Sequence, residues 1–194
     1  MRTDMMRYLK KIRVGAVCLA LLTVAAVGVR HNYAQADGLQ NLQELEPEPA
    51  LSAPVMLPVT GVAGQKATLP LHENKPYMLH LWATWCLPCR EELPKLAALL
   101  KAHPDLPIVP VALDSGSAEQ VVAALPRLHA VGLPVWVAER EHVQPFIKTV
   151  KDPGLPMTLL IDASGQVRAI SDGGVTWDEA QAASIIRNLL QETE

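Results

Sequence analysis

The sequence predicts an α/β protein in which helices flank both faces of a mixed sheet. Two observations lead to this expectation: strand-like and helix-like segments alternate from about residue 53 onward, and the chain closes with a hairpin followed by an amphipathic helix. The chain has 194 residues, of which 49% are hydrophobic. Even without its N-terminal segment, it is long enough to bury one compact core.

Strands are predicted where short apolar runs are bounded by turn residues. Residues 74–76 precede one such run, and Ala163-Ser164-Gly165 provides the tight turn of the closing hairpin. The runs at 106–113 and 133–138 are continuously apolar, which is typical of buried strands. The predicted strands cover residues 66–71, 77–83, 106–113, 133–138, 157–162 and 166–170.

Helices are predicted where apolar residues recur every three to four positions. In the first helix, leucines and alanines share one face, while Glu91, Glu92 and Lys95 are assigned to the solvent face. Pro94 is expected to bend this helix, and Ser117 is expected to cap the next one. The predicted helices cover residues 88–102, 117–129, 142–150 (interrupted by Pro145) and 177–191.

The first 36 residues have the pattern of an export signal. Positive charges precede an uncharged apolar run that begins at Val14 and ends at Val29, and an A-x-A cleavage site ends at Ala36. As a helix the run spans about 24 Å, somewhat short of a ~30 Å hydrocarbon core, so cleavage and retention as an inner-membrane anchor are both open. In either case, the residues after Arg30 are expected outside the cytoplasm.

Residues 37–52 are predicted to form a flexible acidic, proline-containing linker, which leaves 53–194 as the folded domain. The net charge of -3 provides no basic surface for nucleic acid, so a protein or small-molecule partner is expected. Of the three cysteines, Cys18 lies in the N-terminal apolar run. The domain therefore holds a single dithiol and no framework of structural disulfides.

This dithiol, Cys86 and Cys89, is predicted to lie where a strand ends and a helix begins. Unpaired N–H groups and the positive end of the helix dipole stabilise a thiolate there, and the thiolate is the form that attacks disulfides and binds metals. A zinc site needs a second pair of ligands, which the sequence does not offer. A redox-active disulfide without a metal or other cofactor is therefore expected.

The sequence resembles the thioredoxin fold and, more narrowly, its exported TlpA, ResA and CcmG (DsbE) branch. The resemblance rests on W-x-x-W-C-x-x-C-R at 82–90, on the helix proline Pro94, and on G-x-P-x-T at 154–158. It covers the whole predicted domain, and the segment 117–138 fits an insertion of that branch. A weaker likeness to TlpA in particular involves Gly173, Gly174 and Trp177.

The resemblance implies that Cys86 is the attacking thiol and Cys89 the resolving thiol, and their places at the helix start agree with these roles. It also implies that Leu87 and Pro88 tune the redox potential. Pro156 resembles the family's cis proline, which leaves the backbone of the preceding Leu155 free to pair with a partner peptide. The alternatives are a structural cysteine pair and a trans proline that ends a loop.

His80 departs from the family pattern. Strand alternation places it on the same face as Met78 and Trp82, where thioredoxins carry a buried acid thought to assist proton transfer at the resolving thiol. His80 is either a base that acts near neutral pH or a hydrogen-bonded core residue, and the core role is favoured. Glu92 is a second candidate base, although a solvated charge on the helix surface is its expected state.

The tryptophans beside the dithiol are expected to differ in exposure, with Trp82 in the core and Trp85 on a rim that meets the partner. The histidines at 103, 129 and 142 show no ligand spacing and are expected at the surface.

These features predict an exported thiol-disulfide oxidoreductase that faces a periplasm. The resemblance implies a monomeric protein-disulfide reductase that acts on apocytochrome c or on copper-delivery proteins for oxidase assembly. It also implies a membrane electron donor of the DsbD/CcdA type. A disulfide-forming oxidase, a copper chaperone of thioredoxin fold and a thioredoxin-fold peroxidase are the alternatives.

Overall fold

The computed structural model describes residues 39–40, 46–47, 54–70, 74–147, 150, 153–178 and 181–193. The predicted cleavage site at Ala36 and the predicted anchor between Val14 and Val29 lie outside these residues. Within the described part of the chain, no helix combines the length and the apolar character needed to span a membrane.

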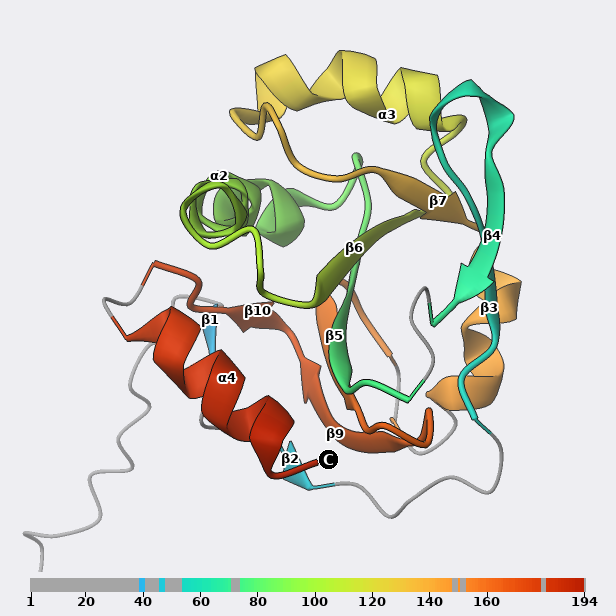
Figure 1. Ribbon diagram of the computed structural model, residues 1–194. Helices are drawn as coiled ribbons and strands as arrows, with labels where there is room; N and C mark the ends of the chain where they lie inside the picture. The colour runs from blue at the N-terminus through green and yellow to red at the C-terminus, as the bar shows by residue number, and fades with distance from the viewer. Residues whose placement is uncertain are drawn as a thin grey trace, which may run out of the picture. The chain divides into compact units, whose positions relative to one another are not determined.

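An eight-stranded mixed sheet in the order β2-β9-β8-β5-β6-β7-β3-β4 forms the centre of the fold, which confirms the predicted α/β class (Figure 1). The central strand β5 runs parallel to β6 and antiparallel to β8. The strands are β2 (Glu46–Pro47), β3 (Leu57–Thr60), β4 (Lys66–Leu69), β5 (Tyr77–Trp82), β6 (Ile108–Leu113), β7 (Trp136–Ala138), β8 (Met157–Ile161) and β9 (Val167–Asp172).

Two short strands that the sequence does not predict, β1 (Leu39–Gln40) and β2, pair with strands near the C-terminal end of the domain. β1 runs parallel to β10 (Gly174–Val175), and β2 pairs antiparallel with β9. Both β1 and β2 belong to the stretch 37–52 that the sequence assigns to a linker. At these two points, therefore, the backbone of that stretch adds to strands of the domain.

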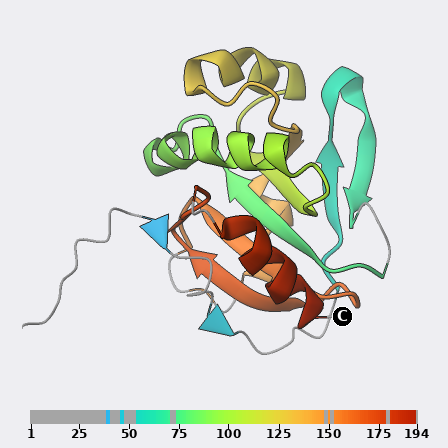
Figure 2. The same cartoon turned by 60° about the vertical axis from the view of Figure 1, so that its left-hand side comes forward.

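The three α-helices of the described residues cover one face of the sheet, so the predicted placement of helices on both faces is wrong. They are α2 (Leu87–Ala102), α3 (Ala118–Ala124) and α4 (Ala182–Gln191), and Figure 2 shows α2 and α4 crossing the sheet on the same side. Their buried residues share an apolar cluster with Met78 and Trp82 of β5. The alternate residues of β5, such as Leu79, belong to a second cluster on the opposite face.

The 3-10 turns η4 (Arg140–His142) and η5 (Gln144–Phe146) lie where the sequence predicts a helix over 142–150, so that prediction is wrong. Pro145 supplies no backbone N–H and disfavours the helical conformation at the residue before it, which limits the segment to short turns. Phe146 is buried in the second cluster, so these turns, rather than an α-helix, cover that face of the sheet.

Other predicted bounds shift where proline and glycine intervene. The last helix starts at Ala182 rather than Trp177, and Gly174 and Val175 form the short strand β10 before it. The sequence analysis does not predict β3, because Pro58 lies within it and proline is disfavoured inside strands. Two further 3-10 turns are η2 (Val62–Gly64) and η3 (Leu125–Leu128), and η3 replaces the end of the helix predicted over 117–129.

Ser117 caps α3 as predicted, within a capping box. Its Oγ accepts a hydrogen bond from the backbone N–H of Gln120 at 3.3 Å, and Gln120 Oε1 accepts one from the backbone N–H of Ser117 at 2.8 Å. We expect Ser117→Ala to lower the free energy of unfolding by about 1 kcal/mol, measured in urea. Ser117→Thr keeps the hydroxyl and is the control. An equal loss in both variants would show that the cap is not the cause.

Candidate active site

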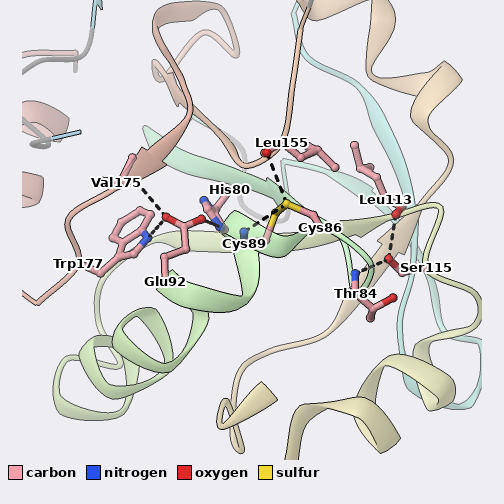
Figure 3. Close-up of a disulfide and its surroundings, with 10 residues drawn as sticks. All are labelled: His80, Thr84, Cys86, Cys89, Glu92, Leu113, Ser115, Leu155, Val175 and Trp177. Atoms are coloured by element: carbon pink, nitrogen blue, oxygen red, sulfur yellow. Dashed lines mark hydrogen bonds and ion pairs between the residues drawn. A yellow bond between two sulfur atoms is a disulfide. The ribbon is translucent and has the colours of Figure 1, made fainter. Parts of the chain in front are cut away.

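Cys86 and Cys89 lie at the junction of β5 and α2, as predicted, and form a disulfide with an S–S distance of 2.03 Å (Figure 3). Cys86 is the N-cap residue of α2, and its Sγ accepts a hydrogen bond from the backbone N–H of Cys89 at 3.2 Å. The first turn of α2 contains no acidic residue. After reduction, the same N–H and the positive end of the helix would stabilise a Cys86 thiolate.

The two cysteines differ in access to solvent. Cys86 keeps 5% of its surface exposed and Cys89 none, while the neighbouring Leu87 and Trp85 are 64% and 56% exposed. A partner can therefore reach the dithiol only from the side of Cys86. The exposure of Trp85 and the burial of Trp82 are both as predicted.

The loop before β8 brings Pro156 to the dithiol, and the Leu155-Pro156 peptide bond is cis, as the resemblance implies. The carbonyl oxygen of Leu155 lies 3.4 Å from Cys86 Sγ. In the disulfide, Sγ carries no proton, so this contact is not a hydrogen bond. The thiol of reduced Cys86 could donate a hydrogen bond to this oxygen. The backbone of Leu155 thus lies next to the sulfur that a partner would meet.

His80 is completely buried, which is consistent with both roles that the sequence analysis left open for it. Its Nδ1 lies 3.1 Å from Oγ1 of the buried Thr158 on the neighbouring strand β8. Its ring packs edge-on against the ring of Trp177, with 5.3 Å between centroids. Neighbours from two distant parts of the chain therefore fix the ring.

Glu92 is also completely buried, so its predicted place on the solvent face of α2 is wrong. Its Oε2 accepts hydrogen bonds from the backbone N–H of Val175 at 2.9 Å and from Trp177 Nε1 at 3.1 Å. These donors come from β10 and the segment after it, which pack against α2. The spacing of Glu92 relative to Cys89 and Leu96 on the buried face of α2 is a signal that could have revealed its position.

Glu92 and His80 form a buried pair, in which Oε1 of the carboxyl lies 3.1 Å from Nε2 of the ring. The alignment falls short of a hydrogen bond, and neither atom has another partner among the described residues. An isolated charge is costly in such a site, so the neutral combinations are favoured: imidazolium with carboxylate, or imidazole with carboxylic acid. Both contain the same number of protons, and both require Nδ1–H to donate to Thr158.

Trp85 is held in place by contacts that the sequence did not indicate. Its Nε1 donates to the carbonyl oxygen of Asp114 at 3.0 Å, and the Arg140 guanidinium lies 5.7 Å from its ring centroid. The backbone N–H and the side chain of Arg140 both donate to the Asp114 carboxylate, and the backbone hydrogen bond contributes most to holding the pKa of Asp114 below its usual value. An exposed aromatic ring is thereby fixed beside Cys86.

Three other histidines lie within the described residues and away from this pair: His103 is half-buried, and His129 and His142 are exposed. Across the described ranges, no three His, Cys, Asp or Glu side chains are grouped so that they could hold a metal ion.

Comparison with known proteins links this site to named relatives. The chain is 25% identical over 175 residues to the thioredoxin-like protein YneN of Bacillus subtilis, covering 89% of this chain and 96% of YneN. It is 29% identical over 109 residues to the thiol-disulfide oxidoreductase ResA of Bacillus thuringiensis, covering 56% of this chain. The matched region is 61% of ResA, less than two thirds of that protein.

Solved structures confirm the thioredoxin fold. A thiol:disulfide interchange protein of the thioredoxin family from Chlorobium tepidum superposes with a TM-score of 0.52 and 25% identity, over 75% of this chain and 97% of that one. A putative thiol-disulfide oxidoreductase from Bacteroides vulgatus has a TM-score of 0.55 at 23% identity, over 75% and 98% of the two chains.

The family model described as the AhpC/TSA family matches residues 49–170, which is more than half of the chain. This region includes the dithiol, the pair His80 and Glu92, and the loop with Pro156. The chain therefore belongs to the AhpC/TSA family and is a thioredoxin-like thiol-disulfide oxidoreductase.

Proposed function

We propose that this protein is an exported protein-disulfide reductase whose Cys86–Cys89 dithiol reduces disulfides in other proteins. The observation that carries the proposal is the setting of Cys86 Sγ, between the backbone N–H of Cys89 and the carbonyl oxygen of Leu155. The N–H of Cys89 favours the Cys86 thiolate, and the backbone of Leu155 can form hydrogen bonds with an incoming peptide strand. The exposed Trp85 and Leu87 give that peptide an apolar surface.

The reaction consists of two thiol-disulfide exchanges. The Cys86 thiolate attacks one sulfur of the partner disulfide, whose S–S bond breaks, and the other partner sulfur leaves as a thiolate that takes up a proton. Cys89 then loses its proton and attacks Cys86 Sγ, which releases the second partner sulfur as a thiol. The partner gains two electrons and two protons, and the protein is left with the Cys86–Cys89 disulfide.

His80 and Glu92 are suited to handle the proton of Cys89, which is itself shielded from solvent. In the view of Figure 3, the ring of His80 lies between the Glu92 carboxyl and the disulfide. The pair can accept one proton when Cys89 becomes a nucleophile and return it when the disulfide is reduced again. In this proposal His80 serves as the base that the sequence analysis left as the less favoured alternative.

We further propose a periplasmic location, with apocytochrome c or a copper-delivery protein as substrate. A membrane donor of the DsbD/CcdA type would supply two electrons per cycle, because an oxidising compartment does not keep a dithiol reduced. These assignments are supported by the resemblance to the TlpA, ResA and CcmG branch and by the export pattern of the first 36 residues.

The test is to trap the partner. We expect Cys89→Ala, expressed in the native host, to accumulate a mixed disulfide between Cys86 and its substrate, because the resolving thiol is missing. Non-reducing electrophoresis and mass spectrometry detect and identify the adduct. Cys86→Ala is the matched control and should form no such adduct, since Cys89 is buried.

The proposal would be wrong if Cys89→Ala formed no adduct while its Cys86 still reacted with an alkylating reagent. A peroxidase would behave in this way, since its Cys86 would be oxidised by peroxide instead of being held by a protein.

A further inference from the structure

A hollow of about 390 Å³ opens beside the dithiol, between the start of α2 and the segment formed by α3 and η3. Trp85 lines it on the side of the dithiol. Its other polar lining residues include Arg90, Ser115, Gln120 and Arg127. We call it the arginine hollow. Its far wall belongs to the segment 117–138, the insertion implied by the family resemblance.

The two arginines are exposed and lack partners of opposite charge. Among the described residues, neither Arg90 nor Arg127 takes part in an ion pair. Glu91 follows Arg90 in the sequence but does not line the hollow, whereas Asp114 binds Arg140 and Glu119 accepts the backbone N–H of Ala63. No acidic side chain lines the hollow.

The position of Arg90 is not explained by helix stability. It lies one residue after Cys89 in the first turn of α2, where a positive charge faces the positive end of the helix dipole. A cation at this place is unfavourable for the helix unless an anion approaches it. This observation suggests that Arg90 serves a bound group.

Two other polar groups in the hollow are already used inside the protein. Ser115 Oγ donates to the carbonyl oxygen of Leu113 and accepts the backbone N–H of Thr84. Gln120 Oε1 accepts the backbone N–H of Ser117. The Thr84 hydroxyl and the Gln120 side-chain N–H groups are neutral donors in the hollow, and its charged donors are the two guanidinium groups, whose planar geometry suits the two oxygens of a carboxylate.

We propose that the arginine hollow binds an aspartate or glutamate side chain of the substrate polypeptide, close to the disulfide that Cys86 attacks. This inference rests on the proposed reductase function. Trp85 both flanks Cys86 and lines the hollow, so a peptide that is held at Cys86 and extends across Trp85 reaches the two arginines. The hollow thereby selects acidic sequences near the reducible disulfide.

The test uses two synthetic peptides with one disulfide each, identical except for glutamate or glutamine on both sides of the disulfide cysteines. Reduced protein is mixed with each peptide, and the second-order rate constant of its oxidation is followed by tryptophan fluorescence. We expect the wild type to react about five-fold faster with the glutamate peptide at low salt, and the preference to fade at high salt.

We expect Arg90→Gln and Arg127→Gln each to reduce this preference, and the double variant to abolish it. Arg187→Gln is the matched control. Arg187 lies on α4, outside the hollow, and pairs with Asp105 at 2.7 Å. If Arg90 acted only by stabilising the Cys86 thiolate, Arg90→Gln would slow both peptides equally and leave their ratio unchanged.

Equal wild-type rates with both peptides would overturn this inference and leave the reductase function intact. A preference that survives the double substitution would also overturn it, since the carboxylate would then bind elsewhere. Failure to reduce either peptide would contradict the reductase function itself, together with the inference that rests on it.

Discussion

Glu92→Ala is expected to lower the free energy of unfolding by about 3–5 kcal/mol. The substitution leaves two buried donors, the backbone N–H of Val175 and Nε1–H of Trp177, without their acceptor. It also removes the group that faces His80 Nε2. Chemical denaturation measures the loss. Glu91→Ala, on the exposed side of the same helix turn, is the control and should change stability by less than about 0.5 kcal/mol.

Glu92→Gln separates the structural role of this side chain from its role in proton transfer. The amide oxygen can accept both donors, and the amide N–H can donate to a neutral His80 Nε2, so the fold should stay close to wild-type stability. The neutral amide cannot balance the charge of a protonated His80, so His80 becomes a weaker base for the proton of Cys89. We therefore expect the release of the partner from Cys86 to slow about 100-fold, while the initial attack by Cys86 changes little.

Single-turnover kinetics with a peptide disulfide resolve these two steps. Release at the wild-type rate in Glu92→Gln would mean that the pair of His80 and Glu92 is structural only. Wild-type stability of Glu92→Ala would contradict the hydrogen bonds of Glu92 to Val175 and Trp177 as a source of stability.

The sequence predicted those parts of the site that depend on neighbours along the chain. The dithiol, the helix that follows it and the Ser117 cap arise from residues a few positions apart, so their spacing reveals them. The family resemblance added Pro156, whose position next to Cys86 depends on the pairing of β8 with β5.

The surroundings of Glu92 could not be predicted in this way. A glutamate in a helix is normally solvated, and only the arrival of Val175 and Trp177, more than 80 residues later, makes its burial affordable. The same reason applies to Trp85, because Asp114 and Arg140 come from the ends of other elements. The helical spacing of Glu92 indicates which face of α2 it lies on, but it does not indicate which distant residues supply the hydrogen bonds.

Trp82→Ala is expected to lower the free energy of unfolding by about 3–5 kcal/mol. The side chain is 1% exposed and belongs to the apolar cluster that contains both cysteines. Loss of the indole would leave a cavity between β5 and α2, because close-packed neighbours collapse only in part. Trp85→Ala is the comparison at an exposed position and should cost much less, since its ring is 56% exposed.

Trp82→Phe tests whether volume or hydrogen bonding sets this cost. The indole Nε1 of Trp82 is buried without an acceptor among the described residues, so phenylalanine removes an unpaired donor while it keeps most of the apolar surface. We therefore expect phenylalanine to cost less than about 1.5 kcal/mol in denaturant unfolding. Equal losses of unfolding free energy in Trp82→Ala and Trp82→Phe would contradict this expectation. They would show that the indole N–H binds a partner such as a buried water, and that its hydrogen bond, rather than the volume of the ring, is what Trp82 contributes.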